Sequence, residues 1–158
     1  MTNKKIRIIA KKVLRKGDEP DISFVPPLVR RRLSPLQKTF FHLARLEGTP
    51  EPANIVFASR FGEDFLTRKI VADFNSGGTV SPKVFSSSVY NAAPGTWSVF
   101  TKCRAAYTAI AAGPDTVKCA NIEALGMDRG PVLLVCAEEL GGCRGFSILF
   151  DFETSSAD

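Results

Sequence analysis

The sequence has 158 residues, of which 44% are hydrophobic and 23% are charged. This composition is typical of one globular domain and excludes collagen-like, low-complexity and intrinsically disordered chains. The net charge is +5, and no apolar run approaches the ~20 residues that a membrane span needs. No signal-peptide pattern follows the basic start of the chain. We therefore expect a cytoplasmic protein without a membrane partner.

Cysteine and histidine positions argue against a metal site. His42 is the only histidine, so this chain cannot build a site that needs two. The four cysteines are Cys103, Cys119, Cys136 and Cys143, and none of them forms a C-x-x-C pair. Zinc-knuckle and thioredoxin-type sites are therefore unsupported. We predict no metal and no cofactor, and we expect Cys119 and Cys136 to be small buried hydrophobic residues.

Positive charge is concentrated in the first third of the chain. Residues 1–48 carry twelve Lys and Arg and four Asp and Glu, whereas residues 49–158 carry nine and twelve. Such an asymmetry predicts an acidic partner, either nucleic acid or an acidic protein. A solvated, solubilising surface is the alternative interpretation.

The chain opens with signals for a strand and a capped helix. β-branched residues predict a strand over Ile6–Ala10. A helix is predicted from Ser34, which can cap it, through Pro35 in the first turn, and Gln37 completes a capping box. We expect this helix to stop at Gly48.

A buried strand and a second helix are predicted next. The apolar run Asn54–Ser59 lacks alternation and fits a strand that is buried on both faces. The helix follows Gly62 and places Leu66, Ile70 and Phe74 on one apolar face.

The second half of the chain completes an α/β order. We predict a helix of small residues after Val89, a strand over Ala105–Ile110 and a helix over Pro114–Gly126 whose apolar face includes Val117, Ala120, Ala124 and Leu125. Strands over Pro131–Ala137 and Gly145–Phe152 follow. The loop between these last two strands is too short for a parallel crossover, so they should pair antiparallel.

Common catalytic signatures are absent from the sequence. It contains no G-x-G-x-x-G, Walker loop, G-x-S-x-G or H-E-x-x-H motif. Glu138 and Glu139 follow a predicted strand, at the kind of position where active sites gather. Adjacent carboxylates on extended chain face different ways, so we interpret this pair as a solvated surface feature.

Several segments in order resemble the β-ketoacyl synthases. Asn91–Val99 (NAAPGTWSV) is similar to the N-x-A-A-G-x-x-S-I segment of that family. Thr108–Gly113 (TAIAAG) is similar to the T-A-C-A-S-G loop that carries the ketosynthase nucleophile. Residues 30–34, 56–63 and 133–139 resemble matching segments of the smaller ketosynthase-like N-terminal domain proteins. The link between the two main motifs is shorter than in ketosynthases and lacks their Gly-Pro.

The resemblance implies the first half of a thiolase-like fold. We accordingly expect an α/β domain over residues 1–152, with a mixed, mostly parallel sheet and helices on both faces, and a frayed tail over 153–158. In the family, the strand before the nucleophile lies at the dimer interface. The resemblance therefore implies interface residues in both motifs, namely Asn91, Ala93, Gly95, Trp97, Thr108 and Ala109.

The nucleophile position is occupied by isoleucine. Where the ketosynthase loop has its cysteine, this chain has Ile110, whose alkyl side chain cannot form an acyl-enzyme. Ketosynthases also use histidines from their second half for decarboxylation, and this chain contains only His42. We therefore predict no catalytic residue here, which favours a protein that is not itself an enzyme.

The resemblance implies a non-catalytic, chain-length-factor-like subunit of a type II polyketide, fatty-acid or aryl polyene system. Such a subunit would pair with an active ketosynthase, or with itself, and shape the acyl tunnel. Acyl carrier proteins are acidic partners in this family, and Arg30, Arg31 and Arg32 are the candidate residues that bind one. The alternatives are a basic module that binds nucleic acid or another acidic partner, and an enzyme of unrecognised chemistry. The basic residues lack interleaved stacking aromatics, so we expect no nucleic-acid partner.

Overall fold

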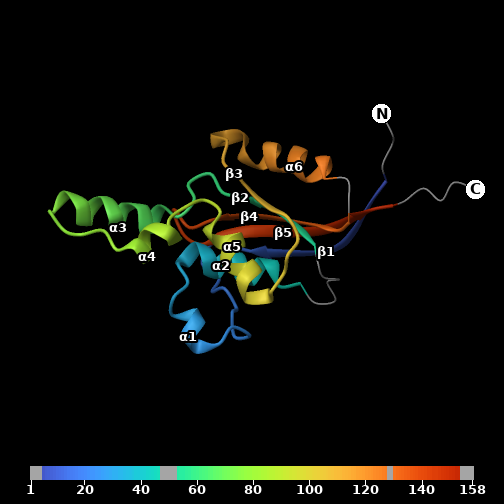
Figure 1. Ribbon diagram of the computed structural model, residues 1–158. Coiled ribbons are helices and arrows are strands. Elements are labelled where there is room, and N and C mark those ends of the chain that lie inside the picture. The colour runs from blue at the N-terminus through green and yellow to red at the C-terminus, as the bar shows by residue number, and fades with distance from the viewer. Residues whose placement is uncertain (1–4, 47–52, 128–129, 154–158) are drawn as a thin grey trace, which may run out of the picture.

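A mixed five-stranded sheet forms the centre of the protein, with helices on both of its faces (Figure 1). This computed structural model describes residues 5–46, 53–127 and 130–153. The strands are β1 (Ile6–Leu14), β2 (Asn54–Ala58), β3 (Tyr107–Ile110), β4 (Val132–Glu138) and β5 (Arg144–Phe152). The helices are α1 (Pro27–Arg30), α2 (Pro35–Ala44), α3 (Asp64–Asn75), α4 (Pro82–Ser87), α5 (Ala92–Thr101), the 3₁₀ helix η1 (Gly113–Asp115) and α6 (Thr116–Gly126). Within the described residues, no helix is long and apolar enough to cross a membrane.

The strand order is β1-β5-β4-β2-β3. β2 pairs parallel with both β3 and β4, whereas β5 pairs antiparallel with β4 and β1. Four strands therefore run in one direction and β5 runs against them, which confirms the predicted mixed sheet and the antiparallel last pair. β1 is longer than the predicted Ile6–Ala10 because it continues along β5 until Leu14 lies opposite Gly145. Lys11 and Lys12 interrupt the apolar pattern after Ala10, so the sequence did not predict this extension.

Helices α2 and α5 cover one face of the sheet. The predicted capping box is confirmed. The backbone N–H of Gln37 donates to Ser34 Oγ (3.0 Å), and the backbone N–H of Ser34 donates to Gln37 Oε1 (3.3 Å). Phe41 of α2 and Trp97 of α5 pack edge to face, with ring centroids 5.1 Å apart. α2 ends at Ala44, before the predicted stop at Gly48, which lies outside the described residues.

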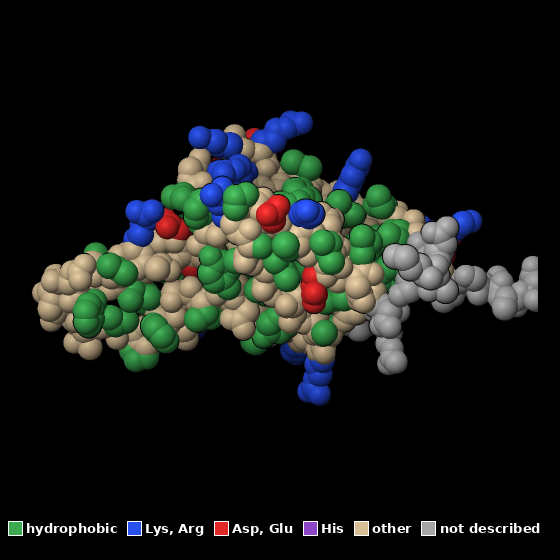
Figure 2. Space-filling view, turned by 90° about the horizontal axis from the view of Figure 1, so that it is seen from above, with side chains coloured by type: hydrophobic (Ala, Val, Ile, Leu, Met, Phe, Trp, Pro, Cys, Tyr) green, Lys and Arg blue, Asp and Glu red, His purple; other side chains and the backbone are tan. Residues whose placement is uncertain are grey.

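Helix α6 lies on the opposite face, where it contacts the sheet through small residues. Ala120 and Ala124 are buried against β2 and β4, together with Val56 and Leu134. The prediction that Val117 and Leu125 share this buried face is wrong, because both are exposed. They and Ile122 leave apolar side chains on the outer surface of the helix, and Figure 2 shows hydrophobic side chains across this side of the molecule.

Helices α3 and α4 project from the body as an arm (Figure 1). The predicted helix after Gly62 is present as α3, but neither α3 nor α4 contains a buried residue. Phe74, which the sequence pattern placed on an apolar face, is 71% exposed. We call these two helices the α3–α4 arm. The predicted small-residue helix is confirmed as α5, and the predicted tail beyond Glu153 lies outside the described residues.

Candidate functional site

The turn between β3 and α6 is the position where the sequence resemblance places a nucleophile. Ile110 is the last residue of β3, is half-buried and packs against the apolar cluster that α6 makes with the sheet. Its carbonyl accepts a hydrogen bond from the Ser59 amide (3.2 Å). An alkyl group in this environment completes the core and cannot attack a thioester.

The turn itself is well hydrogen-bonded. The Thr116 hydroxyl accepts from the Ala112 amide (2.9 Å) and donates to the Gly113 carbonyl (2.8 Å). Gly113 has a φ of 54°, in the left-handed region that glycine adopts at low cost. The chain thus has a strand–turn–helix geometry at this point without a reactive side chain at Ile110.

Two cysteines lie on elements that follow this turn, Cys119 on α6 and Cys136 on β4. Cys136 lies in β4 and is buried, as the sequence predicts. Burial raises the pKa of the Cys136 thiol to about 12, and the Glu138 carboxylate also raises it, so this thiol is protonated at neutral pH. Cys119, which we expected to be buried, is only half-buried on α6.

Glu138 and Glu139 tie distant segments together, which corrects their interpretation as a solvated pair. The Glu138 carboxylate accepts hydrogen bonds from the Ser59 hydroxyl (3.0 Å) and from the amides of Arg60 and Phe61. It therefore closes the loop that follows β2. Charge-assisted bonds of this kind are stronger than neutral ones.

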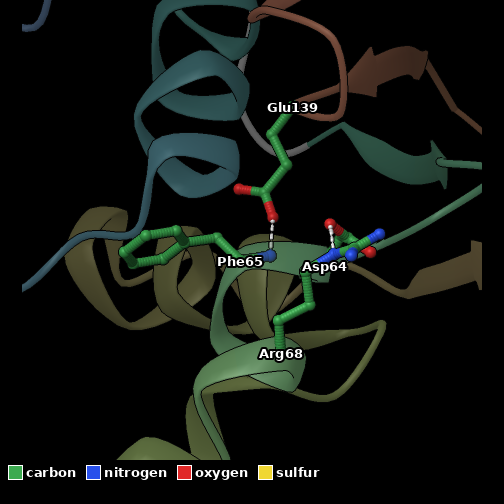
Figure 3. A network of polar contacts seen from close by, with 4 residues as sticks. All are labelled: Asp64, Phe65, Arg68 and Glu139. Carbon is green, nitrogen blue, oxygen red and sulfur yellow. Dashed lines mark hydrogen bonds and ion pairs between the residues drawn. The ribbon is translucent and has the colours of Figure 1, made fainter. Parts of the chain in front are cut away.

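Glu139 holds the N-termini of two helices. Its carboxylate accepts from the Leu36 amide in the first turn of α2 (3.2 Å) and from the Phe65 amide in the first turn of α3 (Figure 3). Asp64 pairs with Arg68 one turn along α3 (2.6 Å). The two backbone hydrogen bonds and the helix dipoles favour the carboxylate, but burial outweighs them and raises the pKa of Glu139. Glu139 thereby fixes the base of the α3–α4 arm against the body.

Glu63 is a buried carboxylate beside this junction. It is 2% exposed, its Oε1 accepts from the Ser34 hydroxyl (2.9 Å), and its Oε2 has no hydrogen-bond partner among the described residues. Burial raises the pKa of Glu63 to about 7; Ser34 and Gln37 oppose this shift through hydrogen bonds, and the charge of Glu139 adds to it. Glu63 is therefore partly protonated near neutral pH.

We expect Glu63→Gln to raise stability at pH 8 and to change it little at pH 5. Folding raises the pKa of Glu63 from its ordinary value of 4.5 to about 7. The protein therefore loses folding stability as the pH rises through this range, by on the order of 3 kcal/mol. Thermal unfolding at the two pH values measures this, with the exposed Glu123→Gln as the matched control. A variant that shifts the melting temperature equally at both pH values would contradict the assignment.

The predicted interface residues separate into three sets. Ala93 and Trp97 are buried in the chain's own core, so their side chains are occupied within the domain. Asn91 and Gly95 line a hollow of about 370 Å³ between α4, α5 and β3, together with Val99 and Tyr107. Thr108 and Ala109 are half-buried in β3, and Ala109 packs toward the α5 side of the core.

The three consecutive arginines surround the end of α1. Arg31 and Arg32 are exposed and Arg30 is half-buried. Arg30 and Arg31 line a shallow hollow of about 270 Å³ with Lys38. None of the three arginines forms an ion pair with a carboxylate in the described part of the chain.

Known structures share this architecture. A chain of the complex of the ketosynthase ApeO with its chain length factor ApeC from Xenorhabdus doucetiae superposes with a TM-score of 0.82 at 19% identity, over 95% of this chain and 80% of that chain. A chain of the ishigamide ketosynthase/chain length factor superposes with a TM-score of 0.65 at 12% identity, over 90% of this chain and 49% of that one. At these identities the similarity establishes the fold, which is the thiolase-like α/β fold of ketosynthases. No curated protein matches the sequence.

The family follows from the sequence itself. The family described as "Beta-ketoacyl synthase, N-terminal domain" matches residues 9–141. The chain therefore belongs to the β-ketoacyl synthase N-terminal domain family, which confirms the resemblance seen in its motifs. It is a ketosynthase-like domain.

Proposed function

We propose that this chain is a non-catalytic, chain-length-factor-like subunit that pairs with an active ketosynthase and shapes its acyl tunnel. The system would be a type II polyketide, fatty-acid or aryl polyene pathway. The observation that carries the proposal is Ile110 in an intact strand–turn–helix element. The motif resemblance aligns Ile110 with the family's nucleophile. The ketosynthase–chain length factor complexes that share the fold support it by analogy.

The two edges of the sheet differ in a way that supports pairing through β3. β1, one edge, carries Lys11 and Lys12 and has a bulge between Ile8 and Ala10. Lysines and bulges are the devices by which natural edge strands resist pairing with other chains. β3, the other edge, has the uncharged sequence YTAI and pairs only with β2 among the described residues. β3 is thus the edge that can accept a strand from a partner.

Apolar side chains next to β3 extend the pairing surface. Val99 is 79% exposed on α5, and Tyr107 is 40% exposed on β3. Phe74 and Phe85, which are 71% and 60% exposed, lie on the α3–α4 arm. Val99 and Tyr107 line one hollow with Ser86 and Ser87 of α4, so this surface reaches the arm. Exposed apolar surface can mark an interaction site. The proposal therefore assigns the partner to β3, to the hollow lined by Asn91 and Gly95, and to the arm.

We predict that the chain forms no acyl adduct and does not decarboxylate malonyl thioesters. Ile110→Cys alone should not restore condensation, because the family also uses histidines beside the nucleophile. This chain has one histidine, His42, which is not placed to act there. It lies in α2 on the opposite face of the sheet, and its Nδ1 accepts from the Asp21 amide (2.9 Å). Intact-mass measurement after incubation with malonyl and acyl thioesters tests this. A covalent acyl adduct on the wild-type chain would overturn the non-catalytic assignment.

We also propose that Arg30, Arg31 and Arg32 bind an acidic acyl carrier protein. Exposed cations mainly accelerate the encounter with an acidic partner, and salt weakens their effect. Replacing all three by alanine should reduce carrier affinity of the assembled complex and flatten its salt dependence, measured at two ionic strengths. The matched control instead replaces Lys5, Arg7 and Lys118, which are exposed and lie outside the surfaces assigned to the partner. Equal affinity and equal salt dependence in the two triple variants would remove this site from the proposal.

A further inference from the structure

A hollow of about 690 Å³ opens at the carboxyl ends of β2 and β4. These two strands are parallel neighbours, and the chain leaves β2 toward β3 on one side and β4 toward β5 on the other. Ligand sites of open α/β sheets characteristically lie outside the carboxyl ends of neighbouring parallel strands. The volume is also within the range of small-molecule sites, roughly 300–1,000 Å³. The hollow begins at Gly113, three residues beyond Ile110, and is separate from the surfaces assigned to a partner above.

The wall of this hollow is largely apolar. Its apolar side chains come from six elements and include Val13, Ala58, Pro114, Val117, Cys136 and Phe146. Cys136 adds no charge, because its raised pKa keeps the thiol protonated. Val13 and Val117 are 62% and 44% exposed, so an apolar group that entered the hollow would cover surface that now faces water.

Four cationic side chains also line the hollow: Arg15, Lys16, Arg60 and Arg144. Within the described residues, none of them forms an ion pair with a carboxylate. Arg144 is held in place by donating from Nη1 to the carbonyls of Leu140 (2.9 Å) and Gly142 (3.1 Å). The side-chain stem of Lys16 lies over Gly142.

One carboxylate lines the hollow, that of Glu138, and it is already hydrogen-bonded to the loop after β2. Glu138 accepts hydrogen bonds from the Ser59 hydroxyl and from the amides of Arg60 and Phe61. It therefore does not neutralise the cations around it by direct pairing. The hollow combines an apolar wall with unpaired positive charge, and that combination is complementary to a ligand with an apolar chain and an anionic end.

We infer that this hollow binds an amphipathic anion, an apolar chain that carries a carboxylate or a phosphate. The chain of the ligand lies against Val13, Val117 and Phe146, and its anionic group faces Arg15, Lys16 and Arg60. The two sources of such a group, a fatty carboxylate and a phosphate ester, share this chemistry. The inference does not depend on pairing with a ketosynthase, so either proposal can fail without the other.

Titration calorimetry of the full chain tests the inference with four probes: decanoate, decyl phosphate, decanol and inorganic phosphate. Saturable binding of decanoate or decyl phosphate is expected, at least tenfold tighter than that of decanol or of inorganic phosphate. The ratio of the dissociation constants of decanoate and decyl phosphate identifies the preferred head group. Saturable binding of neither, or binding of decanol as tight as that of the anions, would overturn the inference.

Two variants locate the site. Arg15→Gln with Lys16→Gln should weaken binding of the amphipathic anion at least tenfold, whereas the charge-matched Lys83→Gln with Arg104→Gln should leave it unchanged. Val117→Trp should abolish binding by filling the hollow, and its side chain starts from an exposed position, so the fold should tolerate it. Circular dichroism checks that each variant is folded. Equal affinity in the two double variants, or unchanged binding to a folded Val117→Trp, would place the ligand elsewhere.

Discussion

Replacing Gly145 with alanine should destabilise the protein by about 3 kcal/mol and lower its melting temperature by roughly 6–12 °C. A Cβ atom at Gly145 would lie 2.3 Å from the Cys136 carbonyl oxygen and 2.7 Å from Leu43 Cδ1. The first of these neighbours is backbone of the adjacent strand and the second is a fully buried core side chain, so neither can move cheaply. β5 would have to shift away from β4 near the carboxyl end of β4, where Glu138 and Glu139 form their hydrogen bonds.

Gly126→Ala is the matched control for this prediction. No atom lies within 4 Å of a Cβ built at Gly126, the last residue of α6, and alanine there should be neutral or stabilising by about 0.5 kcal/mol. Thermal unfolding followed by circular dichroism compares the two variants. A Gly145→Ala protein as stable as Gly126→Ala would show that β4 and β5 are not packed as described.

Val99→Lys should weaken the proposed assembly at least tenfold, which corresponds to about 1.4 kcal/mol. Val99 is 79% exposed on α5 beside the hollow lined by Gly95 and Tyr107, so lysine should not disturb the fold. If a partner covers this surface, the ammonium group is buried without a counter-charge, which is costly. Analytical ultracentrifugation across a concentration series, with the chain alone and with its ketosynthase partner, measures the dissociation constant.

Leu28→Lys is the matched control for the assembly variant. Leu28 is 71% exposed on α1, outside the proposed pairing surface, and the substitution makes the same change of charge at a similarly exposed apolar residue. It should leave the dissociation constant unchanged. If both variants assemble as the wild type does, the pairing surface lies elsewhere.

Local sequence signals predicted the centre of the fold. The runs that form β2 and β4 are almost entirely buried, as uninterrupted apolar sequence requires of strands covered on both faces. The start of α2 followed from three adjacent residues whose side-chain geometry is self-contained. Both features are decided by residues within one turn or one strand, and that is the range over which pattern reasoning is strongest.

Features that depend on distant partners were not predictable in this way. β1 continues past Ala10 only because β5 supplies hydrogen bonds along its whole length. On α6, a helix that touches the sheet through Ala120 and Ala124 leaves its larger apolar residues outside, and periodicity alone does not reveal which side faces the sheet. The arm formed by α3 and α4 also has an apolar stripe that periodicity would assign to a core.

The site shows the same division. The sequence placed Ile110 at the turn after a strand, and the structure has that turn. The roles of Glu138 and Glu139 were missed because their hydrogen-bond partners lie roughly 70–100 positions away along the chain. A weak signal was available, since the pair follows the carboxyl end of a buried strand, and helix N-termini at such a position attract anions. The interface and carrier-binding residues remain predictions that only binding experiments can test.

Native mass spectrometry of the affinity-purified full chain from its source cell tests the central claim most directly. The proposal predicts a stoichiometric complex with a ketosynthase that carries its own catalytic cysteine, with any covalently bound acyl group on that ketosynthase and none on this chain. A chain that purifies with nucleic acid, alone as a monomer, or with an acyl group on its own residues would contradict a non-catalytic, chain-length-factor-like subunit.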